Sequence, residues 1–145
     1  MSEFRQYRRR LPHWRSEGAI YFVTWRVERG IADLDGAERG QVLRSLLHFN
    51  GVRYNLYAAV VMNDHVHALV EPTERVDLEE IIRAWKSFSA RQFSHRVGRV
   101  WQPEYYDRII RDERELEGAT QYIASNPFRR WPDIESYPWL WIAGN

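Results

Sequence analysis

The sequence predicts an α+β domain in which three helices pack on one antiparallel sheet. Two observations carry this prediction: apolar segments of strand and helix periodicity alternate along the chain, and most of them end at glycine, proline or a polar turn. The chain has 145 residues, 44% of them hydrophobic and 28% charged. This size and composition fit one globular domain with its own core and exclude a disordered or fibrous segment.

The first half of the chain contains three predicted strands and one helix. Residues 19–27 are rich in β-branched and aromatic residues, which predicts a largely buried strand. Apolar residues recur at helical spacing over residues 37–49, and Gly51 ends this helix. The apolar runs 55–62 and 65–70 predict an antiparallel hairpin because only two residues separate them.

The second half contains a helix, a strand and a further helix. One apolar stripe predicts a helix over residues 77–95, before Gly98, with a basic and hydroxylated opposite side. A fourth strand follows at residues 105–110. Asp112 is the expected N-cap of the last helix, which Pro127 is expected to stop.

This order of elements matches the ferredoxin-like β-α-β-β-α-β pattern with one C-terminal helix added. We divide the chain into a basic arm at residues 1–18, a domain at 19–127 and an irregular tail at 128–145 that packs on or near the domain. Five arginines and one glutamate make the start of the arm basic.

The composition limits the available chemistry. The 21 basic and 20 acidic residues nearly cancel, so the net charge alone indicates no nucleic-acid partner. The chain has no cysteine, which excludes a thiolate nucleophile and a cysteine zinc site. Any metal must therefore rest on histidine, carboxylate, amide or water ligands.

His65 and His67 lie two residues apart in a predicted strand. Residues at this spacing face the same side of a sheet, so the two imidazoles project together. Such a pair is a natural metal site, but two hydrogen-bonded histidines without a metal have the same spacing. The motif alone leaves both interpretations open.

Tyr122 and Asn126 are four residues apart and share one face of the last predicted helix. Alone, this spacing is also typical of amphipathic packing and of a helix end. If the helix lies across the sheet, the histidines and the amide offer three ligands to a divalent cation, and the phenol offers a nucleophile beside it. A free phenol has a pKa of about 10, so attack at neutral pH needs a nearby cation or base.

Six passages resemble, in matching order, the REP-associated tyrosine transposases, a branch of the HUH single-tyrosine transposases of small bacterial insertion sequences. They are RRRLPHW, GAIYFVTWRV, VVMNDHVHALVEP, WKSFSAR, VWQPEYYDRIIRD and YIASNP. The resemblance spans residues 8–127 and implies a ferredoxin-like catalytic domain. It implies that His65 and His67 bind a divalent metal, Mg²⁺ or Mn²⁺, that Tyr122 is the nucleophile and that Asn126 is a third ligand.

The resemblance also bears on the other tyrosines, and the sequence departs from the family's usual pattern at two places. It favours Tyr122 over Tyr105 and Tyr106, of which one is expected to face the core and the other the opposite side of the fourth strand. Asp64 precedes the first histidine, where the family usually has Asn-His-Val-His preceded by proline. Residues 128–130 are Phe-Arg-Arg, where Val-Lys-Ala is common.

The activity implied is that of a metal-dependent endonuclease and strand transferase. Such an enzyme cleaves and rejoins single-stranded DNA at REP-like imperfect palindromic hairpins through a covalent 5′-phosphotyrosine. We expect a monomer or homodimer without a membrane partner, in the bacterial cytoplasm and associated with the nucleoid through its DNA. Phosphate contacts are expected from Arg8, Arg9 and Arg10 on the arm and from Arg83, Lys86 and Arg91 on the second helix.

Three alternatives stay open at this point. The basic helix face is also typical of a solvated charged surface. The protein could be a non-cleaving hairpin DNA- or RNA-binding protein derived from such a transposase. A small-molecule metallohydrolase is disfavoured, because Tyr122 and Asn126 would have no role in it.

Overall fold

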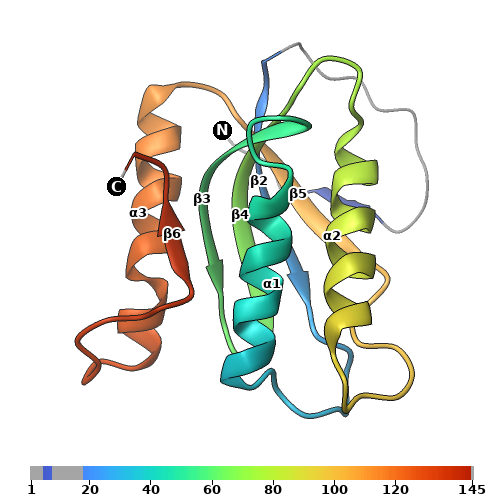
Figure 1. The fold of residues 1–145 in the computed structure, drawn as a ribbon. Helices are drawn as coiled ribbons and strands as arrows, with labels where there is room; N and C mark the ends of the chain where they lie inside the picture. Colours follow the sequence, from blue (N-terminus) through green and yellow to red (C-terminus); the bar gives the residue numbers. More distant parts are fainter. Residues whose placement is uncertain (1–4, 8–17, 145) are drawn as a thin grey trace.

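The computed structural model describes residues 5–7 and 18–144 (Figure 1). The elements are β1 (Arg5–Tyr7), β2 (Ile20–Arg26), α1 (Gly36–His48), β3 (Tyr54–Val61), β4 (His65–Pro72), α2 (Leu78–Gln92), β5 (Tyr105–Ile110), α3 (Glu113–Arg130) and β6 (Leu140–Ile142). The expected DNA contacts at Arg8, Arg9 and Arg10 lie outside the described residues. Among the described residues, no helix combines the length and the apolar composition needed to span a membrane.

The strands form one six-stranded sheet in the order β1-β5-β2-β4-β3-β6, and every neighbouring pair is antiparallel. The central strands β5-β2-β4-β3 have the strand order of the ferredoxin-like pattern, and α3 is the added helix. The predicted α+β class is therefore confirmed. The two outermost strands, β1 and β6, have three residues each.

Alternate residues of the central strands enter two separate cores. Tyr21, Val23 and Trp25 of β2 face the core that lies beneath α1 and α2. Phe22, between them, belongs to a second core beneath α3 and the C-terminal tail. The predicted burial of this strand is confirmed for Tyr21 to Trp25, whereas Arg26 at its end is exposed.

Each helix begins after an aspartate that accepts a hydrogen bond from the first turn: Asp35, Asp77 and Asp112. The prediction for Asp112 is confirmed, with its Oδ1 atom 2.8 Å from the backbone nitrogen of Glu115. The helix predicted to reach residue 95 ends at Gln92. Phe93 there turns into the core in an extended conformation and is 6% exposed, so burial of its ring takes precedence over another helical turn.

The prediction that Pro127 stops the last helix is wrong, because α3 continues to Arg130. A proline removes one backbone donor from a helix, but its carbonyl remains an acceptor. The carbonyl of Pro127 accepts a hydrogen bond from the backbone N–H of Trp131 at 2.8 Å. Phe128 and Trp131 pack against the core beneath α3, and their burial offsets the lost hydrogen bond.

The tail is not irregular as predicted, because residues 140–142 form β6 and pair with β3. The Oη atom of Tyr137 donates to the carbonyl of Val61 at 2.7 Å. Trp139 lies against Gly36 and Gly40 of α1, where added Cβ atoms would stand 3.3 and 3.6 Å from its indole ring. Gly36 therefore leaves room for a side chain that anchors the tail to α1.

Candidate active site

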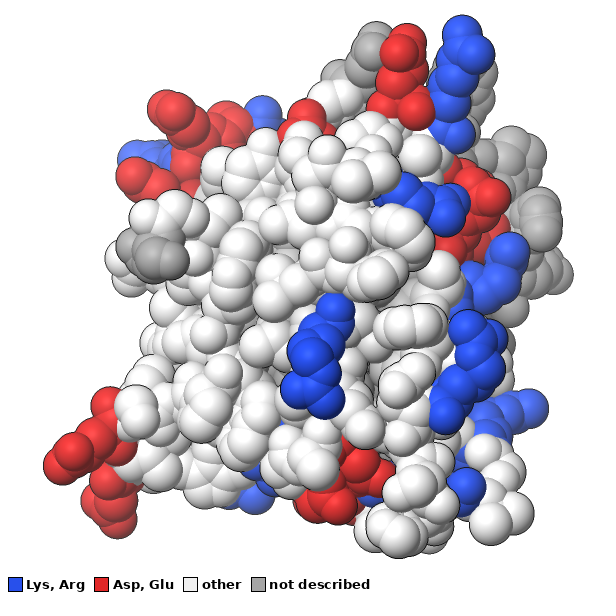
Figure 2. All heavy atoms as spheres, viewed as in Figure 1, with Lys and Arg blue, Asp and Glu red and all other residues white. Residues whose placement is uncertain are grey.

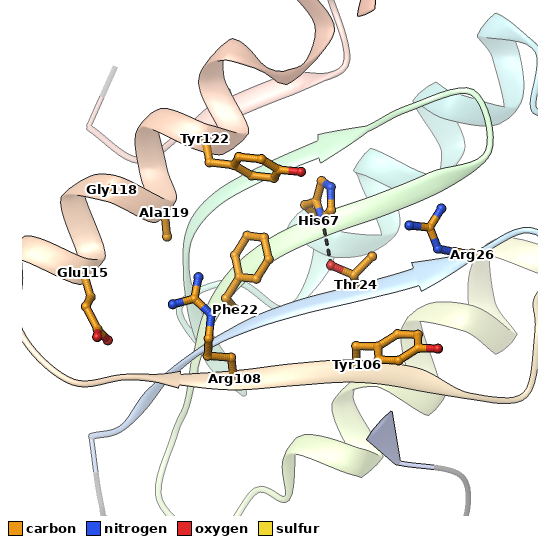
Figure 3. Close-up of a pocket in the computed structure, with 10 residues that line it drawn as sticks. All are labelled: Phe22, Thr24, Arg26, His67, Tyr106, Arg108, Glu115, Gly118, Ala119 and Tyr122. Atoms are coloured by element: carbon orange, nitrogen blue, oxygen red, sulfur yellow. Dashed lines mark hydrogen bonds between the residues drawn. The ribbon is translucent and has the colours of Figure 1, made fainter. Parts of the chain in front are cut away.

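Cross-strand pairing places the candidate residues in rows on the face of the sheet that α3 partly covers (Figure 3). The rows are Arg26–His65, His67–Thr24–Tyr106 and Phe22–Arg108. Because side chains alternate along a strand, each of these residues points away from the core beneath α1 and α2. Figure 3 shows Tyr122 reaching from α3 over Phe22 and His67.

Each histidine of the pair is held through its Nδ1 atom. The Nδ1 atom of His67 lies 2.7 Å from Oγ1 of Thr24, and the Nδ1 atom of His65 lies 2.7 Å from Oδ1 of Asp64. The two ring centroids are 4.7 Å apart. These bonds leave Nε2 of both rings for another partner, which is the arrangement typical of metal-binding histidines.

Both imidazoles are uncharged at neutral pH. Burial lowers the pKa of His65. Burial, with repulsion from the protonated form of His65 and from Arg26 and Arg129, lowers the pKa of His67 to about 3. The contact between Asp64 and His65 is therefore a hydrogen bond from a neutral ring. A neutral imidazole is the form that binds a metal ion.

The nucleophile candidate lies directly beside this pair. The ring centroids of Tyr122 and His67 are 5.4 Å apart, and Tyr122 is 42% exposed, so its phenol is accessible. The guanidinium carbon of Arg129 lies 4.7 Å from the Tyr122 ring centroid. Arg129 was not predicted as a site residue, although its spacing of seven residues from Tyr122 indicates a shared helix face.

The third predicted ligand, Asn126, is buried with 8% exposure one turn after Tyr122. The described part of the chain contains no group of three histidine, cysteine, aspartate or glutamate side chains that could hold a metal. Two neutral imidazoles with free Nε2 atoms nevertheless fit a divalent cation. Within residues 5–7 and 18–144, a third protein ligand there would come from an amide, such as Asn126, or a hydroxyl.

Tyr122 and His67 line a pocket of about 730 Å³. The other lining residues, none of which the sequence analysis assigned to the site, are Phe22, Thr24, Arg26, Tyr106, Arg108, Glu115, Gly118 and Ala119. The alternation of Phe22, Thr24 and Arg26 was a usable signal hidden within an apolar run. As expected for neighbours in a strand, Tyr106 faces the pocket and Tyr105 is buried in the opposite core.

The basic residues predicted on the second helix lie on the opposite face of the sheet. Figure 2, viewed from the side of α1 and α2, shows basic side chains along the α2 side of this face. Arg83 and Lys86 line a groove of about 410 Å³ between α2 and the segment 98–103. Arg91 donates to Oγ of Ser87 at 2.9 Å.

Lys86 is not a simple surface cation. Its Nζ atom donates to the carbonyls of Gln102 and Pro103 at 2.7 and 3.3 Å. Burial lowers the pKa of Lys86 to about 8, so the ammonium is still mostly protonated at neutral pH. Lys86 therefore links the segment 98–103 to α2 by hydrogen bonds.

Comparison with known proteins identifies the fold and the family. A REP-associated tyrosine transposase bound to a REP hairpin has a TM-score of 0.75 with this chain at 18% identity, over 91% of this chain and 81% of that one. The REP-associated tyrosine transposase of Escherichia coli K12 is 24% identical over 132 residues, which cover 89% of this chain and 74% of that protein. A Haemophilus influenzae protein that bears the same family name is 21% identical over 131 residues, covering 79% and 73% of the two chains.

The family model described as "Transposase IS200 like" matches residues 31–126, more than half of the chain. The matched segment includes both histidines, Tyr122 and Asn126. The chain therefore belongs to the family of IS200-like transposases.

Proposed function

We propose that this protein cleaves and rejoins single-stranded DNA at REP-like imperfect hairpins, using Tyr122 as the nucleophile. The observation that carries the proposal is the exposed phenol of Tyr122 beside the neutral imidazole of His67, at 5.4 Å between ring centroids, in a pocket that Arg26 and Arg108 also line. We propose a hairpin as the substrate because one protein of this fold has been solved bound to a REP hairpin. The resemblance to tyrosine transposases implies the tyrosine chemistry, and the exposed phenol of Tyr122 beside His67 supports it.

The reaction conserves the number of phosphodiester bonds. The Tyr122 oxygen gives its proton to water and attacks the scissile phosphorus, while the bond from phosphorus to the 3′ oxygen breaks. The leaving oxygen takes up a proton and becomes a free 3′-hydroxyl, and the 5′ phosphate remains bound to the tyrosine. Attack by a 3′-hydroxyl on this phosphotyrosine reverses the step. Because the phosphotyrosine link retains the energy of the broken bond, joining needs no nucleoside triphosphate.

His65 and His67 are the residues that would hold a divalent cation, Mg²⁺ or Mn²⁺, with Asn126 as a third ligand. When bound, the cation would polarise the scissile phosphate and stabilise negative charge on the leaving oxygen. Thr24 and Asp64 fix the two rings through Nδ1.

The pocket side chains have separate tasks. Arg129 packs on the Tyr122 ring and holds the phenol over the site. Arg26, exposed at the end of β2, lies in the row that contains His65 and is suited to contact a phosphate.

The proposal also assigns the three parts of the chain. Residues 19–127 form the catalytic domain. Residues 128–145 form the tail, whose first three residues complete α3 and bring Arg129 to the Tyr122 ring. The arm at residues 1–18 and the α2 residues Arg83 and Arg91 contact phosphates of the hairpin. Such a protein acts in the bacterial cytoplasm, on chromosomal hairpins.

The test is covalent capture of a labelled hairpin oligonucleotide with a single-stranded flank. In the presence of Mn²⁺, the wild-type protein should form an adduct that survives denaturing electrophoresis, and Tyr122→Phe should form none. Tyr57→Phe is the matched control, because this tyrosine bonds to Glu71 at 2.7 Å, outside the pocket lining. An adduct formed by Tyr122→Phe would refute the assignment.

A chelator distinguishes the alternative function. If the wild-type protein binds the hairpin but forms no adduct with either metal, the protein is a non-cleaving hairpin-binding relative. Loss of the adduct on adding a chelator, with binding retained, supports the metal-dependent enzyme.

A further inference from the structure

The pocket extends well beyond the groups that the chemistry uses. From His67 and Tyr122 it continues toward the start of α3, where Arg108, Glu115 and Gly118 line it. Its volume of about 730 Å³ lies in the range of about 300–1,000 Å³ that is typical of small-ligand sites. A tyrosine and a phosphate alone do not need this space.

The sheet gives the pocket a floor of flat groups. Phe22 stacks on His67 with centroids 5.3 Å apart and planes inclined by 23°. The guanidinium carbon of Arg108 lies 5.4 Å from the Phe22 ring centroid, so an imidazole, a phenyl ring and a guanidinium follow one another. Tyr106 adds a half-buried ring on the neighbouring strand.

The helix above this floor leaves room. The residues of α3 that line the pocket before Tyr122 include Gly118 and Ala119, the two smallest side chains. A Cβ atom added at Gly118 would meet no other atom within 4 Å. Ala119 is buried in the core beneath α3, so the room for a flat ligand lies beside Gly118.

Charge gives the pocket a direction. Figure 3 shows Arg26 and Glu115 at opposite ends. At the start of α3 the charges of Glu115 and Arg108 oppose each other, whereas Arg26 and His67 line the end suited to the scissile phosphate. An apolar floor with arginine at a flat surface matches an unpaired nucleobase, which stacks on aromatic rings and guanidinium planes.

We propose that this pocket binds one unpaired nucleotide next to the scissile bond, with its base between Tyr106, Arg108 and the start of α3. The inference rests on the proposed function for the identity of the strand. It adds a site that reads the presence of a base at one position of the flank.

The test is an abasic scan measured by equilibrium binding. The Tyr122→Phe protein, which cannot react, is titrated with hairpins whose unpaired flank carries one abasic nucleotide at each position in turn. One position should raise the Kd about tenfold above the others, the size expected for loss of one stacked base. A flat scan overturns the proposal.

Variants then locate the base. On intact DNA, Arg108→Gln, Tyr106→Leu and Gly118→Leu should each raise the Kd by a similar factor and should add little on the abasic DNA. Gly118→Leu fills the pocket without removing any side-chain contact. A raised Kd in this variant therefore indicates a blocked pocket and not a loss of folding. The matched control is Arg111→Gln, an exposed arginine outside the pocket lining, which should keep the full abasic effect.

The outcomes separate this inference from the proposed function. If each substitution raises the Kd by the same factor on intact and on abasic DNA, the base does not lie in this pocket. The inference is then wrong, whatever the adduct assay shows. If the wild-type protein forms no adduct but the scan shows the dependent position, the pocket is a nucleotide site of a non-cleaving protein.

Discussion

The two faces of the central sheet have opposite surroundings, although the same strands build both. Trp25 of β2 is 1% exposed and packs between Trp85 and Trp101, with ring centroids 5.5 and 6.2 Å away. Arg26, the next residue, is exposed and lines the pocket. The difference teaches that α1 and α2 seal one face for stability, which leaves the partly covered face available for polar groups.

The first prediction separates these roles at adjacent residues. Trp25→Ala should lower the free energy of unfolding by about 3–5 kcal/mol, because it leaves a cavity in the sealed core. Arg26→Gln should change it by less than about 0.5 kcal/mol while weakening DNA binding. Urea unfolding and hairpin titration measure the two effects. Equal destabilisation by both variants would show that the faces are not separate.

The second prediction concerns the pH dependence of the open face. The pKa of His67 is about 3 in the folded protein, below its ordinary value of 6.5, because of burial. The stability contributed by its neutral form is therefore complete above pH 6.5 and is lost as the pH falls toward 3. At pH 5 the loss is about 2 kcal/mol.

Urea unfolding at pH 7 and pH 5, with a chelator present, measures this loss. His67→Asn keeps a group that can bond to Thr24 but does not titrate, so most of the loss should disappear. His65, whose pKa burial also lowers, should leave a smaller dependence of the same sign. An undiminished loss in His67→Asn would place the titrating group elsewhere.

The third and smallest effect concerns two neighbouring arginines. Arg129 lies over the Tyr122 ring, whereas Arg130 lies over Trp131 at 5.0 Å. Arg129→Gln should slow adduct formation about threefold, in keeping with the loss of one exposed cation–π contact. Arg130→Gln should leave the rate unchanged in the same single-turnover assay. Equal rates for the two variants would remove Arg129 from the site.

Local periodicity was enough to predict much of this molecule. The spacing of two between His65 and His67 fixed their common face, and the order of elements gave the ferredoxin-like arrangement. The approach of Tyr122 to His67 depended instead on where α3 lies across the sheet, which local sequence does not encode. The resemblance to a family supplied that pairing.

The residues and elements that were not predicted from the sequence have a common physical explanation: their structure depends on packing against distant parts of the chain. In the run 20–26, apolar residues face both cores, so the polar alternation of Thr24 and Arg26 on one face is masked by Tyr21, Val23 and Trp25 on the other. Pro127 failed as a stop signal because core packing beyond it outweighs one lost hydrogen bond. The strand β6 has only three residues and acquires its structure from β3, so its own sequence contains little periodic signal.

The short outer strands have a consequence for the behaviour of this chain at high concentration. An unpaired strand edge exposes backbone donors and acceptors that can template edge-to-edge aggregation. β5 and β3, with six and eight residues, would present such edges if β1 and β6 did not pair with them. With three residues each, the outer strands offer little length for a neighbour to join. Resistance to aggregation thus depends on the two outer strands. Removing β1 or β6 would expose the backbone edge of β5 or β3 to pairing with another molecule.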